Sequence, residues 1–417
     1  MKKIYLSVLA LYIGILGSHA QAPAGNKDTT NYKVRKLKIE EINYVTAYYH
    51  QNGNNSAVTG GIGTEKLSDF ANTIDVQVSG LRPGNHKNTV LFELGVDHYS
   101  SASSDKIDPN SISSASKSDT RIYPSVNFTR SNENTGNAFG FTASYSHEFD
   151  YQSLGAGFNL TRISPDKNTQ FDLKLQAFLD RWKVILPVEL RPPGYGSGSE
   201  EEGGRVDHKP RNSFSASFSL SQVFNQRLQA ALIVEPSYQH GLLATKYQRV
   251  YFNSNFPVGV GRDLNIFNER SENLPGTRYK LPVAIRVNYF AGDRFIIRTF
   301  YRYYMDNWGI NANTAELEIP VKLTSFVSIS PFYRFNSQQG TKYFAPYGKH
   351  VTDETYYTSD YDLSTLQSNF FGAGFRLAPP KGVFGYQHLA SLELRFGHYI
   401  RSTGLHSNIL TLHFKLK

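Results

Sequence analysis

The sequence of 417 residues predicts an all-β fold, a transmembrane antiparallel up-and-down β-barrel of about 16 strands. Three observations predict it. The chain starts with an export signal, apolar and polar residues alternate with period two along most of it, and short turns alternate with long polar connections. A soluble β-sandwich would also alternate, but its strands are usually shorter, about five or six residues.

The N-terminus has the three parts of a secretory signal peptide. Lys2 and Lys3 form a charged start, an apolar stretch follows, and Ser18-His19-Ala20 gives a small-x-small cleavage site before Gln21. An amphipathic start to the fold is the alternative, and the fit of all three parts disfavours it. The predicted divisions are a signal peptide at 1–20, a short periplasmic segment at 21–38 and an outer-membrane barrel at 39–417.

The composition excludes several classes of protein. No later run approaches the ~20 apolar residues of a membrane-spanning helix, so membrane residence must use strands. Cysteine is absent, which excludes disulfides, thiolate metal sites and a cysteine nucleophile. Mean hydropathy is low at −0.41, yet 14% of residues are aromatic, as in barrels with aromatic girdles. The formal charge of +9 is scattered, so we expect no nucleic-acid partner.

The strands are identified by alternation over segments of ~10 residues, the length of a tilted membrane strand. The clearest apolar faces lie within residues 74–78, 90–96, 139–145, 171–175, 213–220, 281–287, 315–321, 371–377, 392–396 and 410–416. The last of these has Leu410, Leu412, Phe414 and Leu416 on one side. We expect this strand to pair with the first strand near Ile42–Tyr48 and close the barrel.

The connections alternate in length. Short turns rich in Gly, Pro, Asn and Asp are expected at 82–88, 131–136, 164–168, 291–293 and 378–382. Long polar stretches are expected at 51–68, 100–118, 191–211, 239–276 and 338–364, with two short connections near Asp150 and Asp306. Short periplasmic turns and long outer loops are typical of barrels in the Gram-negative outer membrane, and an even strand count leaves both termini periplasmic.

If the apolar positions face lipid, the alternate positions face the lumen. The predicted basic wall of the lumen consists of Arg286, Arg294, Arg298, Arg302, Arg334, Arg376 and Arg395. The predicted acidic wall consists of Asp75, Glu93, Asp97, Asp172, Glu316, Glu318 and Glu393. These charges predict either a transverse field that selects solutes or a structural ladder, with pairs such as Arg302 with Glu316 or Glu318, and Arg376 with Glu393.

Two features near these charges allow more than one interpretation. Gly372 and Gly374 share the face of Arg376, where they either leave lumen space or relieve strand curvature. The segment 352–364 is rich in tyrosine and acid, and we expect a packed loop without a metal ion. We hypothesise that it folds inward and narrows the lumen near Arg302 and Arg334. Its candidate gating residues are Tyr356, Tyr357, Asp360, Tyr361 and Asp362.

No enzyme is expected from this sequence. Serines and histidines are frequent, but no spacing singles out a nucleophile, a base and an orienting group. The dinucleotide fingerprint, a phosphate loop and HExxH are absent. We therefore expect no catalytic residue and no cofactor.

The C-terminal half resembles a known family. The runs that carry the resemblance are YQRVYF (247–252), LPGTRYKLPVAIR (274–286), YRYYMDNWGINANTAELEIP (301–320), SPFYRF (330–335), YFAPY (343–347), YYTSDYDLS (356–364) and LELRFGHYIRSTGL (392–405). Together they resemble a Gram-negative exported family that is known only as a domain of unknown function and regarded as an outer-membrane β-barrel. The resemblance implies the barrel and the outer membrane, and it carries no activity and no catalytic residues.

Two functions follow as expectations. The first is a porin-like channel for small polar or anionic solutes with an arginine-lined lumen. The second is a non-conducting barrel that anchors, exports or assembles a partner such as a surface lipoprotein or a redox component. In either case the outer-membrane lipids are partners.

Overall fold

The computed structural model describes residues 35–100, 118–191, 208–253 and 269–417. The predicted signal peptide, residues 21–34 of the predicted periplasmic segment and the central parts of three predicted long loops lie outside the described residues. The unit Val34–Lys417 is described here by itself. Among the described residues, no helix is long and apolar enough to cross a lipid bilayer.

Strands dominate the described part of the chain. Their bounds are β1 (Lys38–Asn52), β2 (Leu67–Arg82), β3 (His86–Ser100), β4 (Ser118–Asn132), β5 (Ala138–His147), β6 (Tyr151–Ile163), β7 (Thr169–Lys183), β8 (His208–Asn225), β9 (Leu228–Val234), β10 (Ser237–Gly241), β11 (Arg249–Tyr251), β12 (Glu269–Ser271), β13 (Thr277–Ala291), β14 (Phe295–Asp306), β15 (Asn311–Glu318), β16 (Val321–Lys322), β17 (Val327–Gln339), β18 (Leu366–Leu377), β19 (Leu389–Arg401) and β20 (His406–Leu416). Short 3-10 turns are η1 (Ala57–Thr59), η2 (Val188–Leu190), η5 (Tyr361–Leu363) and η6 (Val383–Gly385).

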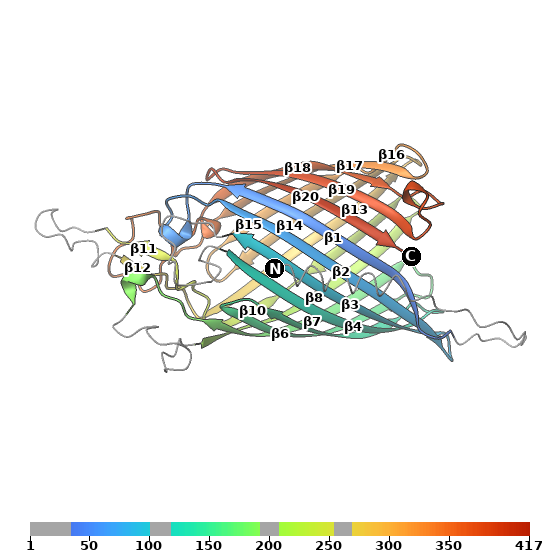
Figure 1. Cartoon of the computed structure of the whole chain (residues 1–417), viewed down its shortest axis with the longest axis horizontal. Coiled ribbons are helices and arrows are strands. Elements are labelled where there is room, and N and C mark those ends of the chain that lie inside the picture. The colour runs from blue at the N-terminus through green and yellow to red at the C-terminus, as the bar shows by residue number, and fades with distance from the viewer. Residues whose placement is uncertain (1–34, 101–117, 192–207, 254–268) are drawn as a thin grey trace, which may run out of the picture. The chain divides into compact units, whose positions relative to one another are not determined.

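The strands form one closed antiparallel sheet of 18 segments, and β11 and β12 form a separate small one (Figure 1). Two pairs of segments are interrupted single strands. Both β9 and β10 pair with β8 and β13 on either side of Pro236, and both β15 and β16 pair with β14 and β17 on either side of Pro320. Proline has no N–H for the ladder. The barrel therefore has 16 strands, which confirms the predicted fold.

The last strand, β20, pairs with the first strand, β1, as predicted. Ile42 lies opposite Leu416 and Tyr48 opposite Leu410, and the rings of Tyr44 and Phe414 stack with centroids 6.1 Å apart. The pairing around the sheet is thereby complete, so no strand of the barrel is left as an edge.

The two faces of the sheet differ in chemistry. On the apolar face, large side chains such as Phe141, Leu175 and Phe396 are 54%, 42% and 48% exposed. On the polar face, Arg395 of β19 comes within 3.5 Å of Glu318 of β15, although β17 and β18 lie between their strands. Side chains so far apart in the sheet meet only on its concave side. The polar face is therefore the interior of the barrel.

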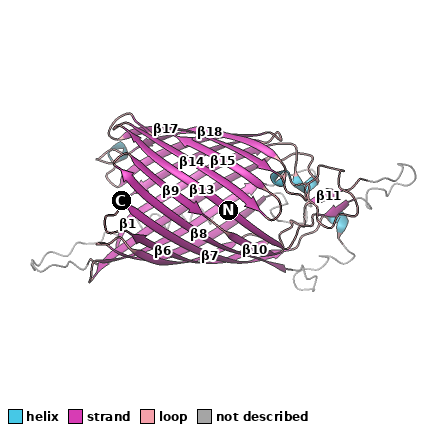
Figure 2. Ribbon diagram, turned by 180° about the vertical axis from the view of Figure 1, so that it is seen from behind, coloured by secondary structure: helices cyan, strands magenta, loops and turns pink. Residues whose placement is uncertain are grey.

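The two ends of the barrel also differ (Figure 2). One end, the turn end, carries the start of β1, the end of β20 and the connections at 83–85, 133–137, 164–168, 226–227, 292–294, 323–326 and 378–388. The other, the loop end, carries the longest connections, the short ones at 148–150, 307–310 and 402–405, and the small sheet of β11 and β12. The connection after Leu377 is longer than the predicted 378–382, because η6 extends it.

Candidate functional site: inner wall and loop layer

Arginine, phenylalanine and glutamate alternate on the inner wall formed by β13 to β19. One row of residues that lie opposite one another reads Arg286, Phe300, Glu316, Arg334 and Phe370 across five neighbouring strands. The next inward row towards the turn end reads Asn288, Arg298, Glu318, Phe332 and Gly372.

Ion pairs within this wall do not have the predicted partners. Arg298 lies 3.3 Å from Glu318, and Arg395 lies 3.5 Å from the same carboxylate. Arg334 is 3.9 Å from Glu316. The predicted pairing of Arg302 with Glu316 or Glu318 was wrong, because the register places Arg302 opposite Thr314 on β15 and Ala284 on β13.

The phenylalanine rings of the wall lie beneath guanidinium groups. The guanidinium carbon of Arg395 is 4.1 Å from the ring centre of Phe332, and that of Arg334 is 4.9 Å from Phe370. The two rings are 5.1 Å apart, centre to centre. Such contacts hold a long cationic side chain in one position.

Glycine makes room for this stack. A Cβ atom built on Gly372 would lie 2.0 Å from the carbonyl oxygen of Phe396 and 2.8 Å from Cζ of Phe332. At Gly374 the nearest neighbours of such an atom would be 3.8 Å away. The sequence suggests that these glycines either leave lumen space or relieve strand curvature, and neither interpretation describes both positions. The Phe332 ring occupies the space over Gly372, whereas Gly374 leaves ordinary room beside Glu393.

Three arginines of the inner wall have no carboxylate partner among the described residues. Arg286 lies over the ring of Phe300 at 5.6 Å, and the buried Nε of Arg302 has no hydrogen-bond partner. Arg376 lies opposite Glu393 in the register, but no ion pair joins them. Arg294, the remaining member of the predicted basic wall, lies in the turn between β13 and β14.

The acidic residues of the early strands lie on the inner face as well. Asp75 of β2 and Glu93 of β3 are directly opposite each other. Asp97 accepts a hydrogen bond from Tyr123 at 2.9 Å, and Asp172 accepts one from Thr161 at 2.7 Å. The glutamates 316, 318 and 393 belong instead to the arginine side of the barrel.

A cavity of about 470 Å³ opens on the arginine side. It is lined by Arg286, Asn288, Arg298, Thr299, Phe300, Glu316 and Glu318. Its volume is that of a site for a small organic molecule.

Loops from around the barrel pack into one layer at the loop end. This loop layer comprises residues 53–66, 184–191, 242–253, 269–276, 307–310, 340–365 and 402–405. It has apolar clusters of its own, one around Leu243, Leu274 and Trp308 and another of Val250, Phe252 and Tyr357. The layer is therefore a folded part of the protein.

Arg249 ties three of these loops together. Its side chain is 2% exposed and contacts Glu189, Glu269 and the carbonyl oxygen of Val58. Val58 follows β1 and Glu189 follows β7, so their hairpins are six strands apart in a barrel of 16. The contact thus spans the mouth of the barrel.

Arg401, at the end of β19, joins the loops of three neighbouring hairpins. Its buried guanidinium contacts Asp362 and lies 3.6 Å from Glu65. Its Nε also donates to Thr403 at 2.6 Å. One side chain thereby joins loops 53–66, 340–365 and 402–405.

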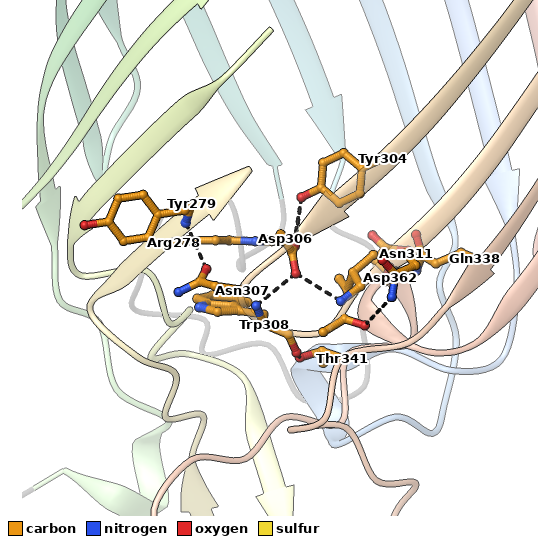
Figure 3. Close-up of polar contacts among 12 residues, drawn as sticks. Arg278, Tyr279, Tyr304, Asp306, Asn307, Trp308, Asn311, Gln338, Thr341 and Asp362 are labelled. Carbon is orange, nitrogen blue, oxygen red and sulfur yellow. Dashed lines mark hydrogen bonds and ion pairs between the residues drawn. The ribbon is translucent and has the colours of Figure 1, made fainter. Parts of the chain in front are cut away.

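Asp306 anchors the layer to the barrel wall (Figure 3). Its fully buried carboxylate lies 2.6 Å from Arg278 and accepts hydrogen bonds from the backbone N–H groups of Trp308 and Ile310. The indole of Trp308 lies under the guanidinium of Arg278 at 4.3 Å. The backbone carbonyl oxygen of Trp308 accepts a hydrogen bond from the Thr341 hydroxyl. The turn after β14 is thus connected to the long loop after β17.

The predicted gating loop is part of this layer. Tyr357 is buried and Asp360 is half-buried, Asp362 contacts Arg401, and η5 packs through Leu363 against the Trp308 cluster. Tyr356 is 40% exposed. Arg302 lies four residues from the loop end of β14, about 13 Å down the strand. The loop therefore lies at the mouth, above the level of Arg302.

Buried acids hold the layer together. Glu272 is 2% exposed and accepts hydrogen bonds from the Thr358 hydroxyl and the Thr245 N–H. Burial, followed by the nearby charge of Asp360, raises the pKa of Glu272 to about 8. Burial and the charge of Asp362 raise the pKa of Asp360 to about 7. Near neutral pH the Glu272 carboxyl group is thus mostly protonated in the packed layer, and the Asp360 carboxyl group is about half protonated.

One acidic cluster was not anticipated from the sequence. Carboxylate oxygens of Asp119, Glu148 and Asp150 lie within 4.8 Å of one another at the rim. They come from the start of β4 and the turn after β5, which adjoin because the two strands form a hairpin. In the predicted acidic loop, Glu354 instead contacts His350 at 2.5 Å.

Fold and interior together define a closed antiparallel barrel with an apolar exterior, a polar interior and one end covered by loops. The family model described as "Protein of unknown function (DUF3570)" matches residues 96–384. The chain belongs to this family, which confirms the resemblance seen in its sequence motifs.

Solved structures show a distant likeness. OccAB3 of Acinetobacter baumannii is 9% identical, with 91% of this chain and 99% of that chain covered and a TM-score of 0.37. OccK1 (OpdK) of Pseudomonas aeruginosa is 7% identical, with 90% and 98% covered and a TM-score of 0.38. The deltaS2 mutant of the TodX monoaromatic hydrocarbon channel is 9% identical, with 91% and 88% covered and a TM-score of 0.38. No curated protein matches the sequence.

Proposed function

We propose that this protein is a Gram-negative outer-membrane channel, without enzymatic activity, for small polar solutes with a preference for anions. The observation that carries the proposal is the inner wall of β13 to β19, where six arginines accompany three glutamates. These residues are Arg286, Arg298, Arg302, Arg334, Arg376 and Arg395 with Glu316, Glu318 and Glu393. An excess of fixed positive charge along a pore raises the local concentration of anions.

The exterior supports residence in a membrane. Large apolar side chains are exposed on the outer face of strands all around the barrel, for example Phe92, Leu220 and Leu394. Such a face is unfavourable in water and favourable in lipid. The short turns then face the periplasm, together with the start of β1 and the end of β20. The loop layer faces the outside of the cell.

The loop layer makes passage conditional. Arg249 joins loops across the mouth and Arg401 joins neighbouring loops at its edge, so solutes reach the arginine wall when these loops separate. The proposed resting state is narrow at the loop end, and the candidate gating residues belong to the part that must move.

The same layer favours a second candidate function. A mouth closed by a folded layer also suits a non-conducting barrel that anchors or exports a partner, such as a surface lipoprotein, through its outer loops. In that case the inner arginines and glutamates hold the wall together and select nothing.

Reconstitution of the full chain in a planar bilayer distinguishes the two functions. The channel predicts discrete conductance steps and a reversal potential that indicates anion preference in a KCl gradient. Absence of conductance from both the native chain and the Arg401→Gln variant would reject the channel, because that variant weakens the closed layer. Co-purification of one stoichiometric partner would then support the second function.

A further inference from the structure

A cation, an aromatic ring and an anion lie side by side in one row of the inner wall. Arg286 of β13 is opposite Phe300 of β14, and Phe300 is opposite Glu316 of β15. Neighbouring strands are about 4.8 Å apart, so the backbones that carry the two charges are about 10 Å apart. The ring of Phe300 lies between them.

These two charges do not form an ion pair with each other. The described contact of Arg286 is the Phe300 ring at 5.6 Å. Glu316 has its nearest cation, Arg334, at 3.9 Å on the side away from Arg286. Glu318, one step along the same strand, has two arginines within 3.5 Å. Within the wall, Arg286 and Glu316 thus have fewer and more distant ionic contacts than Glu318 has.

The cavity of about 470 Å³ brings the three groups to one surface. Its charged lining consists of Arg286, Arg298, Glu316 and Glu318, two cations and two anions. Arg298 and Glu318 neutralise each other at 3.3 Å, which leaves Arg286 on one side of Phe300 and Glu316 on the other. The cavity therefore carries little net charge and a strong separation of charge.

We propose that this cavity is a binding subsite for zwitterionic solutes of the amino-acid type. The carboxylate of the solute lies at Arg286, its ammonium group lies at Glu316, and its apolar part covers the Phe300 ring. A plain anion would meet Glu316, and a plain cation would meet Arg286, so each leaves one charge of the wall unsatisfied. The inference deepens the proposed channel function by naming the solute class that pauses at this wall.

Calorimetric titration of the full chain in detergent micelles tests the subsite without requiring conduction. The probes are L-phenylalanine, 3-phenylpropanoate and 2-phenylethylammonium, which share a phenyl body and differ in charge. L-phenylalanine is expected to bind, and removal of either charged group should weaken binding about tenfold or more. Equal or tighter binding of 3-phenylpropanoate, or no binding of any probe, would overturn the proposal.

Variants separate the roles of the two charges. Glu316→Gln should weaken L-phenylalanine about tenfold and bring 3-phenylpropanoate to similar affinity, whereas Arg286→Gln should weaken both. Arg130→Gln, at an exposed position on the outer face of β4, is the matched control and should change neither. If Glu316→Gln fails to assemble, Phe300→Leu provides the second variant, and it should weaken all three probes.

The outcomes also separate this subsite from the channel itself. A barrel that binds L-phenylalanine but never conducts retains the subsite and loses the channel. A barrel that conducts with anion preference but binds none of the probes retains the channel and loses the subsite.

Discussion

Arg395 on β19 lies with its guanidinium carbon 4.1 Å from the ring centre of Phe332 on β17, across the intervening strand β18. The same guanidinium lies 3.5 Å from Glu318 on β15. One side chain of β19 thus reaches β17 and β15 and spans four neighbouring strands over their concave surface. It can do so because β18 contributes Gly372 and Gly374 at that level.

Alanine at the two glycines should have unequal effects. At Gly372 the added Cβ would meet the Phe396 carbonyl at 2.0 Å, so the strands must separate, whereas at Gly374 it meets nothing within 3.8 Å. We expect Gly372→Ala to lower the free energy of unfolding by about 1–3 kcal/mol and Gly374→Ala to change it by less than about 0.5 kcal/mol. Urea unfolding in detergent measures both. Equal losses would show that the stack adapts freely.

Charge reversal at Arg302 should alter ion selectivity. Arg302 has no carboxylate partner among the residues that the structure describes, so Arg302→Glu changes the charge of the wall without breaking an ion pair there. The reversal potential in a KCl gradient should move towards cation preference, and Arg298→Glu should move it in the same direction. Arg130→Glu on the outer face is the control. Unchanged selectivity in both inner variants would exclude the arginine wall as the selective element.

The loop layer should loosen as the pH rises. The pKa of Glu272 is about 8 in the packed layer, against 4.5 for an ordinary glutamate. The layer binds this proton more tightly than the opened loops do, so its stabilisation is complete below about pH 4.5 and is lost as the pH rises through 8. Asp360 acts in the same direction, with a pKa of about 7.

Fluorescence of Trp308 reports this transition, because its side chain is buried in the layer. In a Trp182→Phe background the chain keeps one tryptophan. Its emission should shift to longer wavelength between about pH 4.5 and 8, and Glu272→Gln should flatten the change. A transition of the same size in Glu272→Gln would assign it to another group.

Loss of the Arg401 link should release loop 53–66. Arg401→Gln leaves the buried Glu65 without its cation, which costs about 3 kcal/mol and favours the open layer. We expect faster proteolysis within residues 53–66 and more frequent channel opening. Lys349→Gln, at an exposed position of the same layer, should leave both unchanged. If the loops of Arg401→Gln resist proteolysis as well as those of the native chain, Arg249 alone is sufficient to hold the loop layer closed.

Alternation identified the strands because period two is a local property. The apolar faces of β3, β18 and β20 can be recognised in the sequence, and the pairing of the last strand with the first followed from the need to close the sheet. The ion pairs could not be predicted in the same way. A partner depends on the relative shift of two strands. The sequence suggests Glu316 or Glu318 for Arg302, whereas the register places Glu316 opposite Arg334 and Glu318 opposite Arg298.

The contacts of the loop layer cannot be predicted from the sequence, for a different reason. Arg249 and Glu189 are 60 positions apart, and Asn55 and Thr403 are 348 apart, and no periodicity connects them. Their meeting depends on which hairpins the closed barrel brings to the same end. The tyrosines of residues 356–364 suggested a packed loop, but only the fold identifies Trp308 and Arg401 as what it packs against.

The seam between β1 and β20 also constrains the order of assembly. Asn43 and His413 hydrogen-bond across it, although 370 positions separate them along the chain. Each of these strands has one flank that stays unpaired until the other arrives, and an unpaired flank readily adds a strand from another molecule. A nascent chain halted before β20 would therefore be a polymerisation hazard in the periplasm. Delivery of this protein to its membrane thus requires a factor that covers the unpaired edges of β1 and β20 until the two strands pair and close the barrel.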